Sequence, residues 1–525
     1  MTKICFALGS ALFAFMLYPI LTLAQAPKQT VPENWWHKDL EKDSIPGIGL
    51  ERTYAELIGD AEGKPVVVAV LDTKIDIAHL DFKGMFWSNS DEIDTNGLDD
   101  DNNGFVDDIH GWNFLGNPQG DEVPYQLAEI VRVIRRFKET YGDEVEKAPK
   151  TILQTYLKAQ KELEEERKSY QDYIVYLDSA AQQYARNKQA IMTLLQEKPY
   201  HVSALDSLRN GGHLSEKEVA WMKKMIARSV EESGFTKEIA ESEKVLNTVL
   251  DLSFNDRTNI AGGNPSLSNN NLPFQHATPV AGIIAAKRDN NNGIDGFSNQ
   301  IRIMPVVMVS YGDEHDEDVA QAIRYAVANG ADIINMSWGK YYTTRPELVR
   351  EAMAYAAEND VLLVTGSGND AIDIDLIPAF PTDQYPKTKK LNNLIVVGGT
   401  TSNMGQELVS WYSNYGQQQV DLMAPASKIT TLNTNNRTKT GSGTSYASPM
   451  VAGTAALLKS HFPDLTAVQL KDVILSAVTQ LDLEVQRPSE DDDVTLVPFS
   501  SLSNSGGLLN VYEAFILAKS LSKNK

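Results

Sequence analysis

The sequence predicts an α/β fold, a doubly wound and mostly parallel sheet flanked by helices, into which an α-helical hairpin is inserted. Three observations lead to this prediction. Residues 66–71 are apolar on both faces, as expected of a buried parallel strand. After residue 276, short apolar segments alternate with helical ones. Between about 121 and 250, the composition changes to Glu, Lys, Gln, Ala and Tyr with few glycines.

The alternating part of the chain supplies the elements of the sheet. After the strand at 66–71, the apolar segments that predict strands are 302–309, 331–337, 361–366 and 394–399. Helical patterns fall near 316–329, 346–359, 466–478 and 508–519, and a further helix begins at Ser445. Strands alternating with helices in this way have few solutions other than a parallel sheet covered on both faces.

The middle segment carries a coiled-coil stripe. Apolar or aromatic residues stand seven apart at Tyr156, Leu163, Tyr170, Leu177, Tyr184 and Ile191. A helix over 150–196 would be roughly 70 Å long, so it must fold back or project. With turns at Pro199 and Gly211 and returning helices at 215–232 and from 236, we expect an antiparallel hairpin. It serves either as scaffold or to restrict access or dock a partner.

The N-terminus is that of an exported protein. Residues 4–23 are almost wholly apolar and a small-residue site follows, which predicts a signal peptide over 1–24 and a periplasmic or secreted product. The alternative is an uncleaved anchor helix. The mature form is expected to have no membrane span, and no disulfides either, because the only cysteine is Cys5. About ten residues are spare before residue 35, so we expect no propeptide.

Composition limits the partners and the domains. The 70 acidic and 48 basic residues give a net charge of −22, which argues against nucleic acid or an anionic membrane surface as partner. A chain of 525 residues with 42% hydrophobic content can bury one large core and carry an appended element. We therefore divide it into 25–120 and 251–525, forming one domain, and an insertion at 121–250. The oligomeric state is not indicated.

Ser445 lies in the glycine-flanked motif GTSYASPMVAG, followed at once by an apolar helical pattern. A serine in the first turn of a helix lies among unpaired N–H groups at the positive end of the dipole, where an oxyanion is stabilised. We expect Pro449 in that same first turn, where its missing N–H removes no hydrogen bond. The alternative is an ordinary N-cap serine.

A nucleophilic serine needs a histidine base, and the histidine needs a carboxylate to hold its tautomer. Asp72 follows the predicted strand at 66–71, where catalytic groups of open α/β sheets gather. His276 begins an apolar helix with Pro279 in its first turn. The three groups follow one another in the order Asp, His, Ser.

These three segments resemble the catalytic blocks of subtilisin-like serine proteases (the subtilase family, peptidase S8), of the bacterial secreted type with a long insertion between the Asp and His blocks. The resemblance implies a serine endopeptidase that hydrolyses polypeptides through an acyl-enzyme and needs no cofactor for its chemistry. It also implies that Asn369 completes the oxyanion hole. The residues it assigns to substrate binding are Ser337, Trp338, Gly339, Gly366, Ser367 and Gly368.

The chain departs from the family pattern at four positions. Lys74 replaces a glycine two places after the catalytic Asp, Ala277 and Pro279 replace a Gly and a His, and Tyr446 stands where methionine is usual. Lys74 keeps open the alternative of a catalytically silent fold that binds a polypeptide. A narrow processing protease is a further alternative. Trp338 is either a pocket residue or a core aromatic.

An acidic loop predicts a structural calcium ion. Oxygen donors stand at alternate places around a glycine turn, as in a calcium loop, and the ligands predicted are Asp99, Asp101, Asn103, Phe105 and Asp107. The twelfth place holds His110 and no glutamate, so a further ligand must come from Asp108, Asp94 or elsewhere. A solvated acidic turn is the alternative.

Overall fold

The computed structural model describes residues 32–194, 205–206, 209–211, 215–227, 231–257, 262–269, 271–272, 274–384, 390–490 and 494–523. The chain forms two compact units: Ile130–Asp256 is one, and the other runs to Glu129 and resumes at Arg257. The predicted signal peptide and the turn at Pro199 lie outside the described residues. Within those residues, no helix has both the length and the apolar character needed to cross a membrane.

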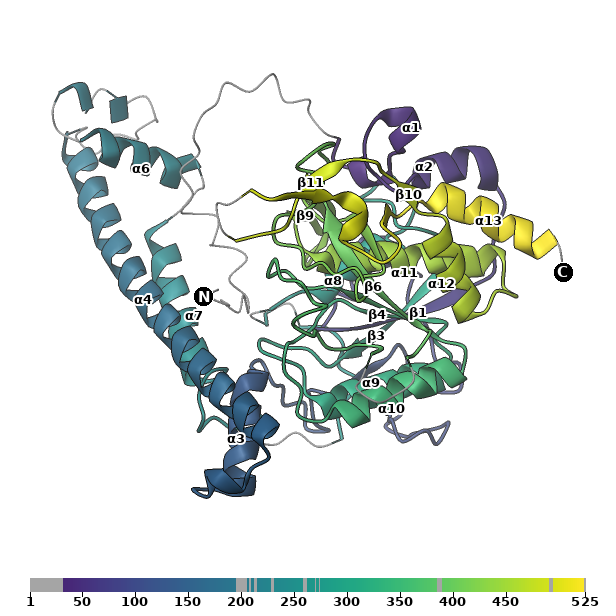
Figure 1. The fold of residues 1–525 in the computed structure, drawn as a ribbon, viewed down its shortest axis with the longest axis horizontal. Helices are drawn as coiled ribbons and strands as arrows, with labels where there is room; N and C mark the ends of the chain where they lie inside the picture. Colours follow the sequence, from purple (N-terminus) through teal and green to yellow (C-terminus); the bar gives the residue numbers. More distant parts are fainter. Residues whose placement is uncertain are drawn as a thin grey trace. The chain divides into compact units, whose positions relative to one another are not determined.

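The larger unit is built on a sheet of nine strands in the order β10-β13-β7-β6-β5-β4-β1-β3-β2 (Figure 1). The strands are β1 (Val66–Asp72), β2 (Trp112–Asn113), β3 (Ile301–Val307), β4 (Ile333–Met336), β5 (Leu362–Gly366), β6 (Leu394–Thr400), β7 (Leu422–Pro425), β10 (Thr479–Gln480) and β13 (Gly507–Leu508). All neighbours pair in parallel except β10 and β13. The predicted doubly wound, mostly parallel sheet is confirmed.

Helices cover both faces of this sheet, because its strands are apolar on both sides. One core holds residues of α8 (Ala277–Ala285), α11 (Thr444–His461), α12 (Ala467–Ser476) and α13 (Val511–Lys523). The other holds residues of α9 (Asp316–Ala328) and α10 (Pro346–Glu358), which Figure 1 shows together on one side. Along β1, Val66, Val68 and Val70 enter the first core, and Ala69 and Leu71 the second. This alternation explains the unbroken apolar pattern of the strand.

Shorter elements complete the unit. They are η3 (Trp35–His37), α1 (Leu40–Asp43), α2 (Leu50–Thr53), the π-helical turn η4 (Tyr54–Ile58), η5 (Leu80–Phe82), the hairpin β8 (Ile429–Asn433) with β9 (Arg437–Gly441), the pair β11 (Glu484–Gln486) and β12 (Leu496–Pro498), and η7 (Phe499–Ser501). Trp35 and Trp36, which precede α1, are buried in the first core.

The winding of the sheet reverses at β1. This strand lies between β3 on one side and β4 on the other, and both pair with it in parallel. Open α/β sheets form their binding crevices at such a point, outside the carboxyl ends of the strands. Those ends are Asp72 on β1, Met336 on β4 and Gly366 on β5, so the segments singled out in the sequence converge at this edge.

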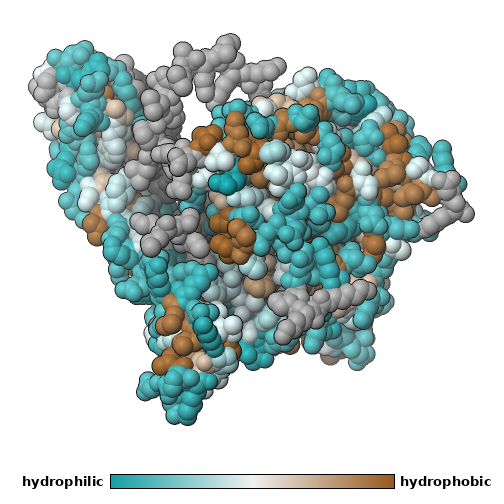
Figure 2. Space-filling view, viewed as in Figure 1, coloured by the Kyte–Doolittle hydropathy of each residue, from teal (hydrophilic) through white to brown (hydrophobic). Residues whose placement is uncertain are grey.

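The smaller unit is helical. Its elements are α3 (Glu129–Tyr141), which begins at the last residue of the larger unit, η6 (Val145–Lys147), α4 (Lys150–Leu194), α6 (Glu216–Ala227) and α7 (Glu232–Asn247). Helix α7 returns antiparallel to α4, because Lys188 pairs with Glu232 at 3.8 Å whereas Arg167 donates to the Leu246 carbonyl at 2.9 Å. Figure 2 shows mostly hydrophilic side chains on the visible face of α4.

The heptad stripe is the packed face of α4. The buried members of the stripe are Tyr156, Leu163, Leu177, Tyr184 and Ile191, and Tyr170 is half-buried. Tyr156 stacks on Phe137 of α3 with ring centroids 3.8 Å apart. The stripe thus holds α4 to the helices before and after it in the chain.

The unit boundaries differ from the predicted insertion at 121–250. Residues 121–129 belong to the larger unit, because the Gln126 side chain accepts a hydrogen bond from the Ser310 N–H at 3.0 Å and the Glu129 N–H donates to Asp313 at 2.6 Å. Their polar composition resembles that of the helices, but their partners lie in the segment after β3.

Candidate functional site

Asp72 and His276 form a hydrogen-bonded pair. Asp72 ends β1 and is fully buried, and His276 is the residue that caps α8. The imidazole Nδ1 lies 2.8 Å and 3.1 Å from the two carboxylate oxygens. Thr73 fixes the entry to the helix, because its hydroxyl oxygen accepts the backbone N–H groups of His276 and Ala277, both at 2.9 Å. With its proton on Nδ1, His276 presents Nε2 as a base.

Ser445 is the second residue of α11, after Gly443, whose φ of +147° lies in the region that favours glycine. Its hydroxyl donates to the Ser337 carbonyl at 3.0 Å. The expectation that Pro449 lies in the first turn is wrong: α11 begins at Thr444, and Pro449 is inside it. A proline there frees the carbonyl four residues earlier, that of Ser445. The Ser337 hydroxyl donates to this carbonyl at 3.1 Å and satisfies it.

Asn369 follows β5 and has its side-chain carbonyl held by α11. Its Oδ1 accepts the backbone N–H of Thr444 at 2.8 Å and the Thr444 hydroxyl at 3.2 Å. The amide N–H₂ group is therefore left for the cavity that Asn369 and Ser445 both line. An amide donor and the N-terminus of a helix at one cavity form the arrangement that stabilises an oxyanion.

One cavity of about 210 Å³ brings the predicted residues together. It is lined by His276, Ser445 and Asn369, and by all six residues assigned to substrate binding: Ser337, Trp338, Gly339, Gly366, Ser367 and Gly368. Trp338 lines the cavity, packs against the second core and donates from its indole to the Leu71 carbonyl at 2.7 Å, so its role as a pocket residue stays a prediction. The site is thus a groove at the point where the winding of the sheet reverses.

Comparison with known proteins decides the family. The profile of the Subtilase family matches residues 63–493, most of the chain. The chain belongs to the subtilase family. This subtilase is 30% identical over 278 residues to the cell wall-associated protease of Bacillus subtilis (strain 168), with 51% of this chain and 29% of that protein covered. It is 31% identical over 207 residues to subtilisin DY of Bacillus licheniformis, with 39% and 71% covered.

Two further matches have similar levels of identity. The minor extracellular protease Epr of Bacillus subtilis (strain 168) is 34% identical over 234 residues, which are 44% of this chain and 34% of that protein. The chain spans about a third of the length of the first curated relatives it matches. Among solved structures, a cold adapted subtilisin-like serine proteinase matches with 26% identity and a TM-score of 0.36, over 47% of this chain and 78% of that one.

Lys74 does not strain the backbone of this subtilase, because it is not among the residues with positive φ. Its ammonium is buried and bonds to Glu122 and, at 2.9 Å, to the Ser266 hydroxyl. A second buried ammonium, that of Lys340, pairs with Glu129 at 3.0 Å and Asp316 at 2.9 Å. Both cations thus have carboxylate partners other than Asp72.

Burial controls the other titratable groups near the site. It lowers the pKa of Lys439 on β9, and the charge of Asp72 acts in the opposite direction. Burial, and then Tyr412 and Asp72, raise the pKa of Tyr446, the residue after Ser445. Burial, and then Asp370, raise the pKa of Tyr341 well above its usual value, so its hydroxyl remains a donor to Asp370. Both tyrosines are therefore neutral at neutral pH.

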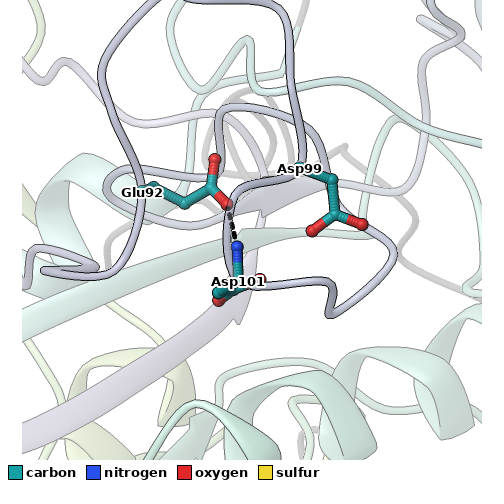
Figure 3. Close-up of side chains that lie close together, drawn as sticks. All are labelled: Glu92, Asp99 and Asp101. Atoms are coloured by element: carbon teal, nitrogen blue, oxygen red, sulfur yellow. Dashed lines mark hydrogen bonds between the residues drawn. The ribbon is translucent and has the colours of Figure 1, made fainter.

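In the acidic loop, the structure brings together Glu92, Asp99 and Asp101, whose carboxylate oxygens lie within 4.8 Å of one another (Figure 3). Asp107 is directed elsewhere: its φ is +56°, and its carboxylate accepts the backbone N–H of Asn96 at 3.0 Å. Asp107 is not one of the three grouped carboxylates, but its backbone N–H donates to Glu92 at 3.1 Å.

The remaining two predicted ligands are engaged within the loop. The side-chain oxygen of Asn103 accepts the Phe105 N–H at 2.7 Å. The Phe105 ring packs on Tyr325, with centroids 4.8 Å apart. The ligand set Asp99, Asp101, Asn103, Phe105 and Asp107 stays a prediction.

Three residues were missed by the sequence analysis. Thr444 orients Asn369, and Glu92 joins the acidic loop from outside it. Asn414 is fully buried and holds the turn after β5, because it donates to the Ser367 carbonyl at 2.9 Å and accepts the Asp370 N–H at 3.0 Å. An asparagine 45 positions after Asn369 carries no local signal of this role, whereas Thr444 adjoins Ser445 and could have been considered.

Proposed function

We propose that this subtilase is an exported serine endopeptidase that cleaves polypeptides through an Asp72–His276–Ser445 triad and an acyl-enzyme. The observation that carries the proposal is the Asp72–His276 hydrogen bond at 2.8 Å, beside a cavity lined by both Ser445 and Asn369. Acyl transfer requires a carboxylate that holds an imidazole and a serine near that imidazole. Here the buried Asp72 holds His276, and Ser445 at the N-terminus of α11 lines the same cavity as His276.

In the first step, the Ser445 hydroxyl leaves the Ser337 carbonyl and gives its proton to His276 Nε2 as its oxygen attacks the peptide carbonyl. Asp72 stabilises the imidazolium, and the Asn369 amide with the Ser445 N–H receives the oxyanion. The intermediate collapses to an acyl-serine, and His276 returns the proton to the leaving amine. Water, deprotonated by His276, then hydrolyses the ester and restores Ser445.

Polypeptides are the substrate class that fits the groove. Gly339 is exposed beside the buried Ser337, so an extended chain can pair with the backbone that follows β4. The apolar N-terminal segment supports export, as do the relatives named as cell wall-associated and extracellular proteases. Export would bring the cleft to proteins outside the cytoplasm.

The decisive experiment is labelling of the purified protein with a fluorophosphonate, which couples only to a serine that its neighbours make nucleophilic. We expect one adduct, mapped by mass spectrometry to Ser445, and none in Ser445→Ala. Ser448 provides the matched control, because it is a buried serine one turn further along α11, and Ser448→Ala is expected to keep the adduct.

Absence of the adduct in folded protein would instead favour the silent polypeptide-binding fold. Digestion of unfolded casein separates the remaining alternatives. A broad protease cuts casein at many sites, whereas a narrow processing protease labels at Ser445 but spares casein.

We also propose that Glu92, Asp99 and Asp101 bind a structural calcium ion. Three carboxylates within 4.8 Å repel one another unless a cation or protons are present, and oxygen donors of this kind suit Ca²⁺. The ion would play no part in the chemistry. It would hold the loop between η5 and β2 to the larger unit.

Removal of calcium is expected to lower the thermal stability of the protein. At a concentration 100 times Kd, calcium adds about 2.7 kcal/mol to the free energy of unfolding, so for a unit of about 400 residues the unfolding midpoint with excess EGTA should fall by about 3 °C. Glu92→Gln and Asp99→Asn should abolish the difference between the unfolding midpoints with and without calcium. Glu407→Gln, which changes an exposed carboxylate, should preserve this difference. Scanning calorimetry with and without calcium measures it, and equal midpoints for the wild type would contradict the site.

A further inference from the structure

Lys74 departs from the family pattern two places after Asp72. It has one partner in the chain before the inserted unit and one in the chain after it. Its side chain is 3% exposed. The ammonium bonds to Glu122, eight residues before Ile130, and at 2.9 Å to Ser266, ten residues after Asp256. The second Glu122 oxygen accepts the Asn269 amide at 2.7 Å. One buried cation therefore joins the chain segments that precede and follow the helical unit.

The segment held in this way leads directly to the catalytic histidine. The Asn269 carbonyl accepts the side-chain amide of Gln275 at 2.8 Å, and Gln275 is the residue before His276. Phe274 stacks on the imidazole, with ring centroids 5.6 Å apart and planes 14° apart. The position of the imidazole thus depends on where Asn269, Phe274 and Gln275 lie.

The backbone of Lys74 acts on the same histidine by a second route. Its carbonyl accepts the Thr73 hydroxyl proton at 3.1 Å. That hydroxyl oxygen in turn accepts the backbone N–H groups of His276 and Ala277. Lys74 therefore bonds to Glu122 and Ser266 through its ammonium and to Thr73 through its carbonyl. In the part of the chain that the structure describes, it forms no hydrogen bond with Asp72 or His276.

We propose that Lys74 and Glu122 form a clasp that positions His276 against Asp72 after the chain returns from the inserted helical unit. Because His276 is 204 positions after Asp72, the chain itself does little to hold them together, and the clasp supplies a local link. Lys74 and Glu122 are positioning residues, because they act through the 266–275 segment. This inference rests on the proposed triad, whose orientation it explains.

The test compares Lys74→Met, Glu122→Gln and the charge reversal Lys74→Glu with Glu122→Lys. The rate of fluorophosphonate labelling and the kcat for a peptide substrate are expected to fall about 10- to 100-fold in the single variants, because a misplaced base slows the chemical step. KM should change less than threefold, since Lys74 and Glu122 are not among the residues that line the substrate groove. The charge reversal and Lys74→Arg should recover at least a third of the lost rate.

Arg52→Met is the matched control. Arg52 pairs with the buried Asp39 at 3.2 Å on the same unit, away from the triad, so its loss should lower the unfolding temperature and leave the labelling rate unchanged. Single variants that unfold earlier yet label at the wild-type rate would overturn the clasp and leave Lys74 a purely structural residue. Failure of the wild type to label would overturn the proposed triad instead.

Discussion

Replacement of Asp72 by asparagine is expected to slow peptide hydrolysis about 10⁴-fold while leaving the fold intact, as the same change does in a trypsin-like triad. Asp72 is fully buried and accepts the Nδ1 proton of His276 at 2.8 Å. An asparagine can turn its amide N–H₂ toward Nδ1, which moves the imidazole proton to Nε2. His276 then has no lone pair for the Ser445 proton. The kcat for a peptide substrate, measured at neutral pH, checks the loss.

Asp76 provides a control of the same chemistry. It is 3% exposed, four residues further along the chain, and accepts the backbone N–H groups of Asn435 at 2.7 Å and Ala78 at 3.2 Å. Asp76→Asn should therefore cost stability, seen in calorimetry, and change kcat by less than tenfold. Asp72→Asn activity within tenfold of wild type would show that His276 does not depend on this carboxylate, and the triad assignment would fail.

The sheet could be predicted because each strand carries its own evidence. Residues 66–71 are apolar at every position, and the structure divides them between two cores, which is the physical origin of that pattern. The α4 stripe was equally visible, because a face that packs on neighbouring helices must repeat with the helical period. Local physics determines these features, so a single segment suffices to detect them.

Features that depend on distant partners could not be predicted. Lys74 was interpreted through its neighbour Asp72, but its partner Glu122 is 48 residues away, and no local pattern connects them. The position of Pro449 was misjudged although the start of α11 was predicted to within one residue, because a helix that starts at Ser445 or Thr444 completes its first turn of about 3.6 residues before it reaches Pro449. Glu92 was not predicted as part of the acidic cluster, because it lies before the loop in the sequence and meets Asp99 and Asp101 only in the folded chain.

Replacement of Asn369 by alanine is expected to lower kcat by 10²- to 10³-fold with little change in KM, the loss known from a subtilisin that lacks the corresponding donor. The Asn369 oxygen is occupied by the Thr444 N–H at 2.8 Å, so the remaining amide group can serve only as a donor to the cavity. A donor aimed at the oxyanion is used in the transition state and hardly at all by the bound substrate. Steady-state kinetics on one peptide separates the two constants.

Thr444→Val tests how the amide is held. This variant keeps the backbone N–H bond to Asn369 but loses the hydroxyl bond at 3.2 Å, so the amide should be less well aligned and kcat should fall by less than in Asn369→Ala. In the double variant, the Thr444 change should act only through its lost bond from the Gly368 N–H at 3.2 Å, because the Asn369 amide is absent, so its effect should be smaller than in the single variant. If replacing Asn369 raised KM and preserved kcat, Asn369 would contact the bound substrate and would not stabilise the transition state. The N-terminus of α11 would then be the remaining donor to the oxyanion.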